Sequence, residues 1–452
     1  MTPRKNNVRA AAAVIVSAGL ALAAACGRGG QAAATKAPAT GPAASTDQTP
    51  ASLDRRLALQ RPDGNTAVDA LLTSDERAVG LEPTKADLWV LLGQAWVRKA
   101  RESADPGFYV NARAAADVAL AIDPEHSGAL DLQGLSLLND HRFESARSLA
   151  QQIVDRRPDD AAALGTLSDA LLELGRVDEA ADSAQRMIDL KPNLPSYVRA
   201  SYLRWITGDV DGAVRAARLA IDSGSDGRYP EPRAWAVVQA AAIFAHEGDY
   251  AGAEAGYDRA LRQVPDYPPA LVGKGRVALA RGDARAAAAL LDRAYDSSPL
   301  AETAWLLGDA RAMGGDDVGA RRAYDRLEHT GRASDHRTLA LFWATKNVHA
   351  QEALALAEAE RDVRGDLYTD DAYAWALYRN GRLADAGKAI DRALSHHTRD
   401  ARLLYHAGAI RCATGDTAGG RALVRQALAL DPAFDVTGAG EARRLMADGS
   451  IP

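Results

Sequence analysis

Apolar residues recur at steps of three and four along most of the chain, which is the spacing of one face of an α-helix. Within residues 161–192, a first helix is predicted to turn three leucines to one side: Leu164, Leu167 and Leu171. After Gly175, a second helix is predicted to present three residues on one face: Ala180, Ala184 and Met187. No long stretch alternates apolar and polar residues with a period of two. The pattern predicts antiparallel helix pairs and an all-α fold.

This helix pair recurs along the chain at intervals of about 34 residues. Prolines that end the second helix of a pair lie 34 apart at Pro124, Pro158 and Pro192, and again at Pro265 and Pro299. One hairpin cannot bury its apolar face alone, so neighbouring hairpins must stack. The spacing predicts about ten units over residues 86–432. Residues 51–85 are predicted to form irregular entry helices, and residues 433–452 a C-terminal cap helix and tail.

The 34-residue hairpin resembles the tetratricopeptide repeat (TPR). In the first unit, Trp89, Leu92, Gly93 and Trp96 stand at the signature places of that family. The resemblance implies a right-handed superhelical solenoid of antiparallel helix pairs. The units are not uniform. Seven extra residues around "ESADPGFY" predict a lengthened first helix or a bulged loop, and the unit at 334–366 lacks the turn glycine.

The N-terminus has the layout of a secretory signal. A basic start is followed by an uncharged, Ala-rich run from Ala10 to Ala25, which at 16 residues is short for a membrane-spanning helix. We therefore expect residues 1–25 to be a signal peptide. The sequence "ALAAAC" resembles a bacterial lipobox and implies lipid attachment at Cys26, although Ala23 stands where the family usually has Leu. Cleavage by an ordinary signal peptidase, without lipid, is the alternative.

Residues 26–50 are small, polar and proline-containing, and are predicted to form a flexible tether. A lipid-anchored protein needs such a spacer between the membrane and its folded part, although a leader without a role would have the same composition. The sequence thus predicts a membrane-anchored protein on the extracytoplasmic face. A soluble secreted protein is the alternative, and a cytoplasmic adaptor a third.

Charge and motifs restrict the possible chemistry. The formal net charge is −6, and it becomes −9 once three basic residues leave with the signal peptide: Arg4, Lys5 and Arg9. A mildly acidic chain without basic blocks argues against a nucleic-acid partner. No phosphate-binding loop, metalloprotease or nucleophile-elbow motif occurs, so we expect no enzyme activity and no cofactor.

Histidine and cysteine provide few candidate ligands for a metal. His396, His397 and His406 form the only local histidine cluster, and without a nearby carboxylate or cysteine they are expected to lie in a solvated turn. Cys412 is expected to be a small buried residue inside a helix.

In TPR proteins the first helices line a concave groove, and the resemblance carries that role to one stripe of this chain. The stripe holds seven aromatic residues and two aspartates: Tyr202, Trp205, Trp305, Asp309, Tyr368, Asp371, Trp375, Tyr378 and Tyr405. We expect these residues to bind an extended peptide or protein segment, with aromatic anchors supplying buried area. The alternative is that Trp375 and Tyr378 pack against the next unit. The Lys/Asn carboxylate clamp of some family members is absent.

These features together predict an exported, lipid-anchored TPR scaffold that mediates protein–protein interaction at the cell envelope. The alternative is an envelope enzyme or metal-handling protein built on helical repeats, for which the three histidines would be the candidate site.

Overall fold

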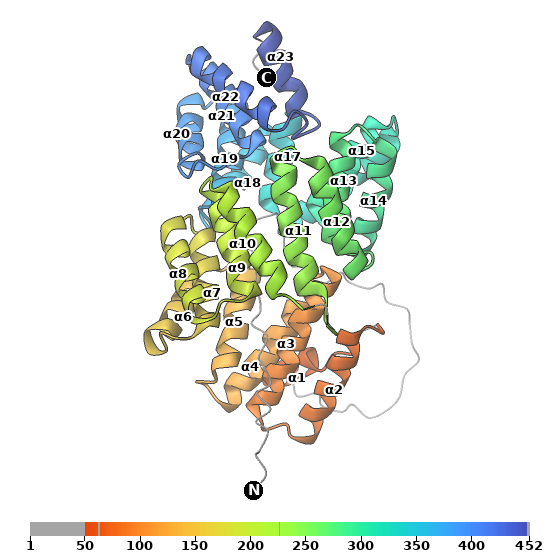
Figure 1. Ribbon diagram of the computed structural model, residues 1–452, viewed down its shortest axis with the longest axis vertical. Coiled ribbons are helices and arrows are strands. Elements are labelled where there is room, and N and C mark those ends of the chain that lie inside the picture. The colour runs from red at the N-terminus through yellow and green to blue at the C-terminus, as the bar shows by residue number, and fades with distance from the viewer. Residues whose placement is uncertain (1–49, 62–63, 226, 450–452) are drawn as a thin grey trace, which may run out of the picture.

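The computed structural model describes residues 50–61, 64–225 and 227–449 (Figure 1). Within these ranges the chain forms helices α1 to α23 and one short 3₁₀ helix, with no β-strand. The predicted all-α solenoid of antiparallel helix pairs is confirmed. The predicted signal peptide, Cys26 and nearly all of the predicted tether lie outside the described residues, so their assignment stays a prediction.

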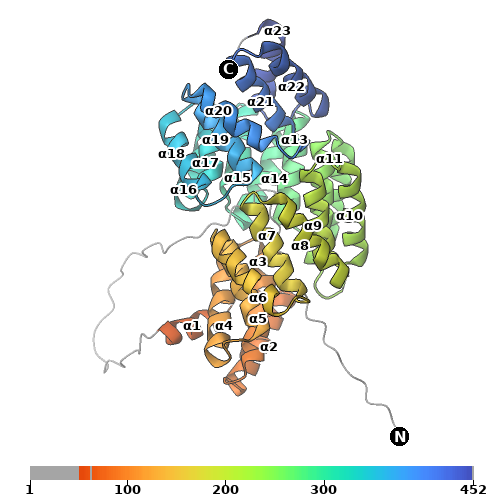
Figure 2. The same cartoon turned by 90° about the vertical axis from the view of Figure 1, so that its left-hand side faces the viewer.

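Successive helices pack as antiparallel hairpins from the orange N-terminal end to the blue C-terminal end of the long axis (Figures 1 and 2). Two helices precede the array: α1 (Pro50–Ala58) and α2 (Ala67–Leu81). The hairpins pair α3 (Ala86–Ser103) with α4 (Tyr109–Ile122), α5 (Ser127–Asn139) with α6 (Phe143–Arg156), α7 (Ala161–Glu173) with α8 (Val177–Leu190), α9 (Leu194–Ile206) with α10 (Val210–Ser223), α11 (Glu231–His246) with α12 (Tyr250–Gln263), α13 (Pro268–Ala280) with α14 (Ala284–Ser297), α15 (Ala301–Met313) with α16 (Asp317–Ser334), α17 (His336–Lys346) with α18 (Ala350–Arg361), α19 (Leu367–Arg379) with α20 (Leu383–Ala393), and α21 (Ala401–Ala413) with α22 (Thr417–Leu430). Helix α23 (Gly438–Asp448) follows the array and contacts α21 and α22.

Five of the ten hairpin turns that the structure describes combine a glycine in the left-handed backbone region with an aspartate that caps the next helix. Gly208 has φ 78°, and the side chain of Asp209 accepts a hydrogen bond from the backbone N–H of Gly212. An aspartate cap satisfies a donor that the first turn of a helix leaves free. In the unit at 334–366, which lacks the turn glycine, Asn347 adopts φ 53° instead. Asparagine tolerates this region better than most residues, which explains how the degenerate unit still turns.

The seven extra residues in the first unit lengthen its first helix and add a short helix after it. Helix α3 has 18 residues, and the 3₁₀ helix η1 (Pro106–Phe108) precedes α4. The carbonyl oxygen of Ala104, just past α3, accepts a hydrogen bond of 2.7 Å from the hydroxyl of Ser298. The insertion thus reaches a residue 194 positions further along the chain.

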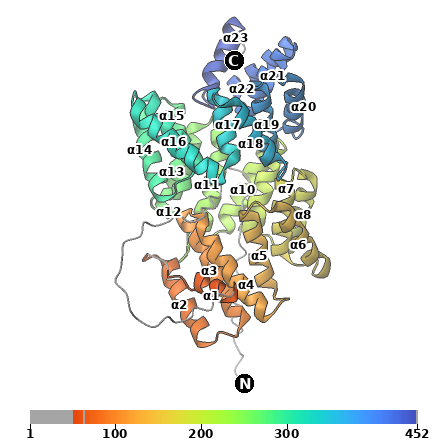
Figure 3. The same ribbon diagram turned by 180° about the vertical axis from the view of Figure 1, so that it is seen from behind.

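The superhelix is wound tightly enough for successive turns to touch. Four hairpin turns contact loops that lie one superhelical turn further along the chain, and we call this line of contacts the seam. The turns are at residues 104, 173–175, 206–208 and 247–248, and the loops are at residues 298, 364–365, 397–399 and 430–431. The N–H of Gly365 donates to the carbonyl of Glu173 at 2.9 Å, and the hydroxyl of Thr398 donates to the carbonyl of Ile206. Figure 1 shows α9 and α10 next to the blue C-terminal helices, and Figure 3 shows α10 there from behind. Thr398 and its partner Ile206 are 192 positions apart in the sequence, and Ser298 and its partner Ala104 are 194 apart. One superhelical turn therefore spans roughly 190 residues.

Replacing Gly175 should test the seam. Both Gly175→Ala and Gly282→Ala place a Cβ at positive φ, which costs roughly 1–2 kcal/mol. Only at position 175 would that Cβ lie 2.3 Å from the carbonyl oxygen of Gly365, because nothing lies within 4 Å at position 282. In chemical unfolding, we expect Gly175→Ala to lower the free energy of unfolding by about 1–3 kcal/mol more than the control Gly282→Ala does. Gly175→Ala should also increase the radius of gyration measured by solution scattering. Equal losses of stability in Gly175→Ala and Gly282→Ala would contradict the role of the seam in holding successive superhelical turns together.

Candidate binding site

Neighbouring cavities lie inside the superhelix and share lining residues. The central cavity, about 190 Å³, is lined by α11, α12, α13, α15, α17, α19, α21 and the loop 431–436. The arginine cavity, about 290 Å³, lies at the seam between α7, α9 and the segment from Arg361 to Asp370, and it shares Arg337 and Tyr368 with the central cavity. A smaller Trp205 cavity shares Tyr202 with the arginine cavity and His246 with the central cavity. Together they form a row of adjacent cavities lined mainly by first helices.

The central cavity combines aromatic walls with charged side chains. Its five aromatic lining residues come from α12, α15, α19 and the loop 431–436: Tyr250, Tyr257, Trp305, Tyr368 and Phe434. Arg276 is paired with Glu302 within the lining. The carboxylate of Asp309 accepts from the ammonium of Lys346 and the hydroxyl of Tyr324, both at 2.7 Å. Such a mixture can hold a segment with both apolar and polar groups.

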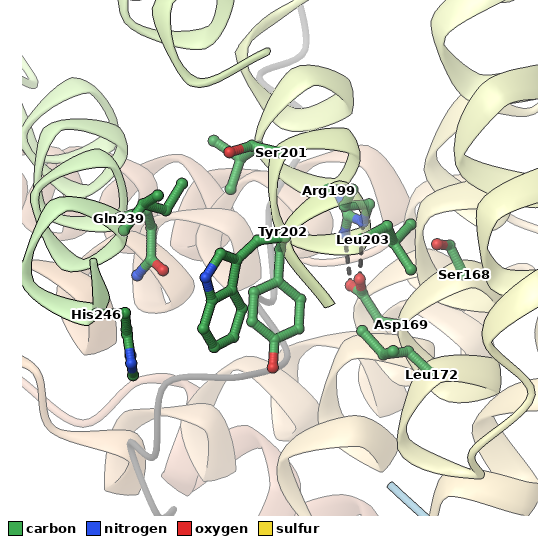
Figure 4. A pocket seen from close by; sticks show the side chains of 12 residues that line it. Ser168, Asp169, Leu172, Arg199, Ser201, Tyr202, Leu203, Gln239 and His246 are labelled. Atoms are coloured by element: carbon green, nitrogen blue, oxygen red, sulfur yellow. Dashed lines mark hydrogen bonds and ion pairs between the residues drawn. The ribbon is translucent and has the colours of Figure 1, made fainter. Parts of the chain in front are cut away.

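The Trp205 cavity is bounded by a buried ion pair (Figure 4). The guanidinium of Arg199 donates to both carboxylate oxygens of Asp169, at 2.9 and 2.6 Å. Burial raises the pKa of Asp169 to about 6, although the neighbouring Arg199 opposes the shift. The ring of His246 packs against Trp205 at a tilt of 44°, with 4.7 Å between ring centroids, and burial lowers the pKa of this histidine. The pair joins α7 to α9 and fixes one wall of the cavity.

The arginine cavity is lined by four arginines and three carboxylates. Arg364 pairs with Glu173 across the seam, and its Nε lies 3.1 Å from Asp366. Arg337 also pairs with Asp366, at 3.2 Å. The other two guanidiniums, Arg361 and Arg392, both donate to Asp370. Arginine pairing thus connects α7, α17, α18, α19 and α20 around one space.

The structure brings five of the predicted groove residues to these cavities. Trp305, Asp309 and Tyr368 line the central cavity, and Tyr202 and Trp205 line the Trp205 cavity. Their predicted role in binding stays a prediction.

The remaining four predicted groove residues, Asp371, Trp375, Tyr378 and Tyr405, are buried against each other and against α21. Trp375 is 1% exposed and stacks on His406, with 4.1 Å between ring centroids. Oδ1 of Asp371 and Nδ1 of His406 are hydrogen-bonded at 2.8 Å. In this arrangement they form packing contacts between successive units, and their predicted role in binding also stays a prediction.

The candidate metal ligands are spread over different environments. His396 lines the arginine cavity, His397 stands at a turn with φ 61°, and His406 is buried beside Asp371. Cys412 is buried, with its Sγ 3.8 Å from the carbonyl of Thr417. Within the described ranges, no group of three or more His, Cys, Asp or Glu side chains could hold a metal ion. Among the helices described, none combines the length and apolarity needed to cross a bilayer.

Sequence reasoning missed Arg361, Asp370 and Arg392. One signal for them existed, because both arginines lie at or near the C-terminal end of a second helix in consecutive units, α18 and α20. Stacking of consecutive hairpins brings such positions together. Arginine is abundant on the second helices of this chain, however, so the signal did not stand out.

A solenoid of stacked helix hairpins defines a class of repeat proteins that act as interaction scaffolds. Family models described as tetratricopeptide repeat match residues 132–195 and 272–335, and a second such model matches residues 244–299. The chain therefore carries tetratricopeptide repeats, as predicted, and repeats of this kind mediate protein–protein interaction. No curated protein matches the chain.

Several solved structures resemble this one at low identity. Human IFIT1 dimer with m7Gppp-AAAA is 12% identical, with 84% of this chain and 94% of that chain covered and a TM-score of 0.46. The Cut9–Hcn1 hetero-tetramer of the APC/C is 13% identical, with 84% and 83% covered and a TM-score of 0.42. PilW, a type IV pilus biogenesis factor, is 17% identical, with 45% and 93% covered and a TM-score of 0.39.

Proposed function

We propose that this protein is an exported, lipid-anchored scaffold that binds a segment of another protein in the cavities enclosed by its superhelix. The observation that carries the proposal is the central cavity, to which first helices from α11 to α21 contribute aromatic and charged side chains. Buried aromatic anchors supply large contact areas at low entropic cost. The N-terminal sequence supports the export and the anchor.

The position of the partner can be tested by photo-crosslinking from two valines of similar exposure. Val436 lines the central cavity and is 40% exposed, whereas Val318 on α16 is 53% exposed and is not among the residues lining that cavity. A photo-reactive residue at position 436 should crosslink one defined protein in intact cells, and the same residue at 318 should not. Equal capture from both positions, or capture only from 318, would contradict binding in the interior.

Lipid attachment predicts a specific effect of Cys26→Ser. The thiol is the acceptor of the lipid, so the variant should lose incorporation of labelled palmitate and move from the membrane to the soluble fraction. Cys412→Ser is the matched control, because that thiol is buried in α21 and should leave both readouts unchanged. Persistent labelling of Cys26→Ser would overturn the assignment of the anchor.

A further inference from the structure

Arg361 and Arg392 share one carboxylate at the outer part of the arginine cavity. Nε of Arg361 donates to Oδ1 of Asp370 at 2.8 Å, and the terminal nitrogen of Arg392 donates to the same oxygen at 2.8 Å. Asp370 is only 5% exposed, and its side chain lies between the two guanidiniums. Arginine stays charged at all ordinary pH values, so one carboxylate neutralises only half of this pair's charge.

The charged groups in the inner part of the same cavity are already paired with one another. There, Arg337 pairs with Asp366, and Arg364 pairs with Glu173. Glu360, which does not line the cavity, lies 3.2 Å from Arg364. These groups form a closed network of two cations and three anions, and each is occupied by another member. Among the lining residues, the outer pair is therefore the place where positive charge exceeds negative charge.

The two outer guanidiniums still have donors to offer. A guanidinium has five N–H groups, and Arg361 uses only its Nε for Asp370. Arg392 donates to Asp370 through Nε and one terminal nitrogen and to the carbonyl of Lys388 through the other, which leaves one N–H on each terminal nitrogen. The side chains of Arg361 and Arg392 are 37% and 42% exposed, so their free N–H groups reach water. Ser395 and His396 line the same cavity and add polar groups next to the arginines.

We propose that this outer part of the arginine cavity is a binding site for an oxyanion, either a phosphate or a carboxylate group, held between Arg361 and Arg392. The buried Asp370 fixes both side chains before the ligand arrives, which lowers the entropic cost of binding. Planar guanidinium forks match oxyanions through paired, charge-assisted hydrogen bonds. The proposal rests on the proposed function in one respect: the anionic group is then carried by the bound partner.

Calorimetric titration with inorganic phosphate, and separately with acetate, tests the site at constant ionic strength. Wild-type protein should bind one phosphate or acetate per chain with a Kd of about 1 mM, as a few charge-assisted hydrogen bonds allow. Arg392→Gln should weaken this binding at least tenfold. Arg361 remains paired with Asp370 in this variant, which keeps the buried carboxylate neutralised.

Arg382→Gln is the matched control. Its side chain is 45% exposed and pairs with Glu358 and Asp385 instead of facing the cavity, so binding should be unchanged. Arg361→Gln serves as a second variant if Arg392→Gln is less folded by circular dichroism. Preference for phosphate or for acetate identifies the group that the site takes. Absence of binding by wild type, or equal binding by wild type and both cavity variants, would overturn the site and leave crosslinking from Val436 unaffected.

Discussion

Arg364→Ala should destabilise the protein by about 3–5 kcal/mol, because it leaves buried carboxylates without their cation. Arg364 is 8% exposed, and it pairs with Glu173 on the adjacent superhelical turn and with Glu360 at 3.2 Å. Its guanidinium also lies 5.0 Å from the ring centroid of Phe143. Burial already raises the pKa of Glu173, and Arg364 opposes that shift. Removing the arginine should therefore raise the pKa of Glu173 further.

This pKa change gives the variant a characteristic pH dependence. A carboxyl group whose folded-state pKa is raised adds stability below its unfolded-state pKa, and that stability is lost as the pH rises. The loss caused by Arg364→Ala should thus be larger at pH 8 than at pH 5. Arg382→Ala, which removes an exposed ion pair, should change stability by no more than about 0.5 kcal/mol.

Chemical unfolding followed by circular dichroism measures the size of the loss caused by Arg364→Ala. A repeat array can unfold in parts, so hydrogen exchange must show where the loss falls. Exchange should accelerate first in residues 161–175 and 364–370, which meet at the seam. A loss no larger than that of Arg382→Ala, or exchange that accelerates elsewhere first, would contradict the role of this pair in joining the turns.

The helix hairpins could be predicted from the sequence because their signals are local. Apolar spacing sets each helix, a glycine with positive φ sets most turns, and the 34-residue period sets the stacking. The seam could not be predicted in this way. Gly175 and Gly282 occupy the same place in their units, yet the first lies against Gly365 and the second lies in open space. Their difference depends on superhelical pitch, which sums small rotations over many units.

The candidate site was predicted only in part for a related reason. Position within a repeat identifies the face of a first helix, but in a tightly wound superhelix that face contacts both cavities and neighbouring units. Trp305 and Trp375 both lie on first helices and are 6% and 1% exposed, but only Trp305 is among the residues lining the central cavity. The arginine cavity combines residues more than 170 positions apart, such as Glu173 and Arg364, and no local pattern indicates such a pair.

Trp375→Ala should cost about 3–5 kcal/mol, the loss typical of a large buried aromatic side chain in a core. The indole stacks on Tyr378 and His406, with ring centroids 4.7 and 4.1 Å away, and Arg379 lies 4.6 Å above it. Its removal would leave a cavity between α19 and α21 and weaken the contact of two consecutive units. The measurement is chemical unfolding, with Tyr373→Ala on the same helix as the control, because Tyr373 is half-buried and should cost less.

Partner capture separates packing from binding at this position. If Trp375 serves packing, capture by crosslinking from Val436 should fall only as far as the folded fraction falls, and low temperature that restores folding should restore capture. If Trp375 instead anchors the partner, the variant should unfold at nearly the wild-type denaturant concentration and still lose capture. The indole is 1% exposed, so a partner could contact it only after α19 and α21 separate. Such separation would expose a large apolar surface and is costly, which is why we expect the loss to appear in stability.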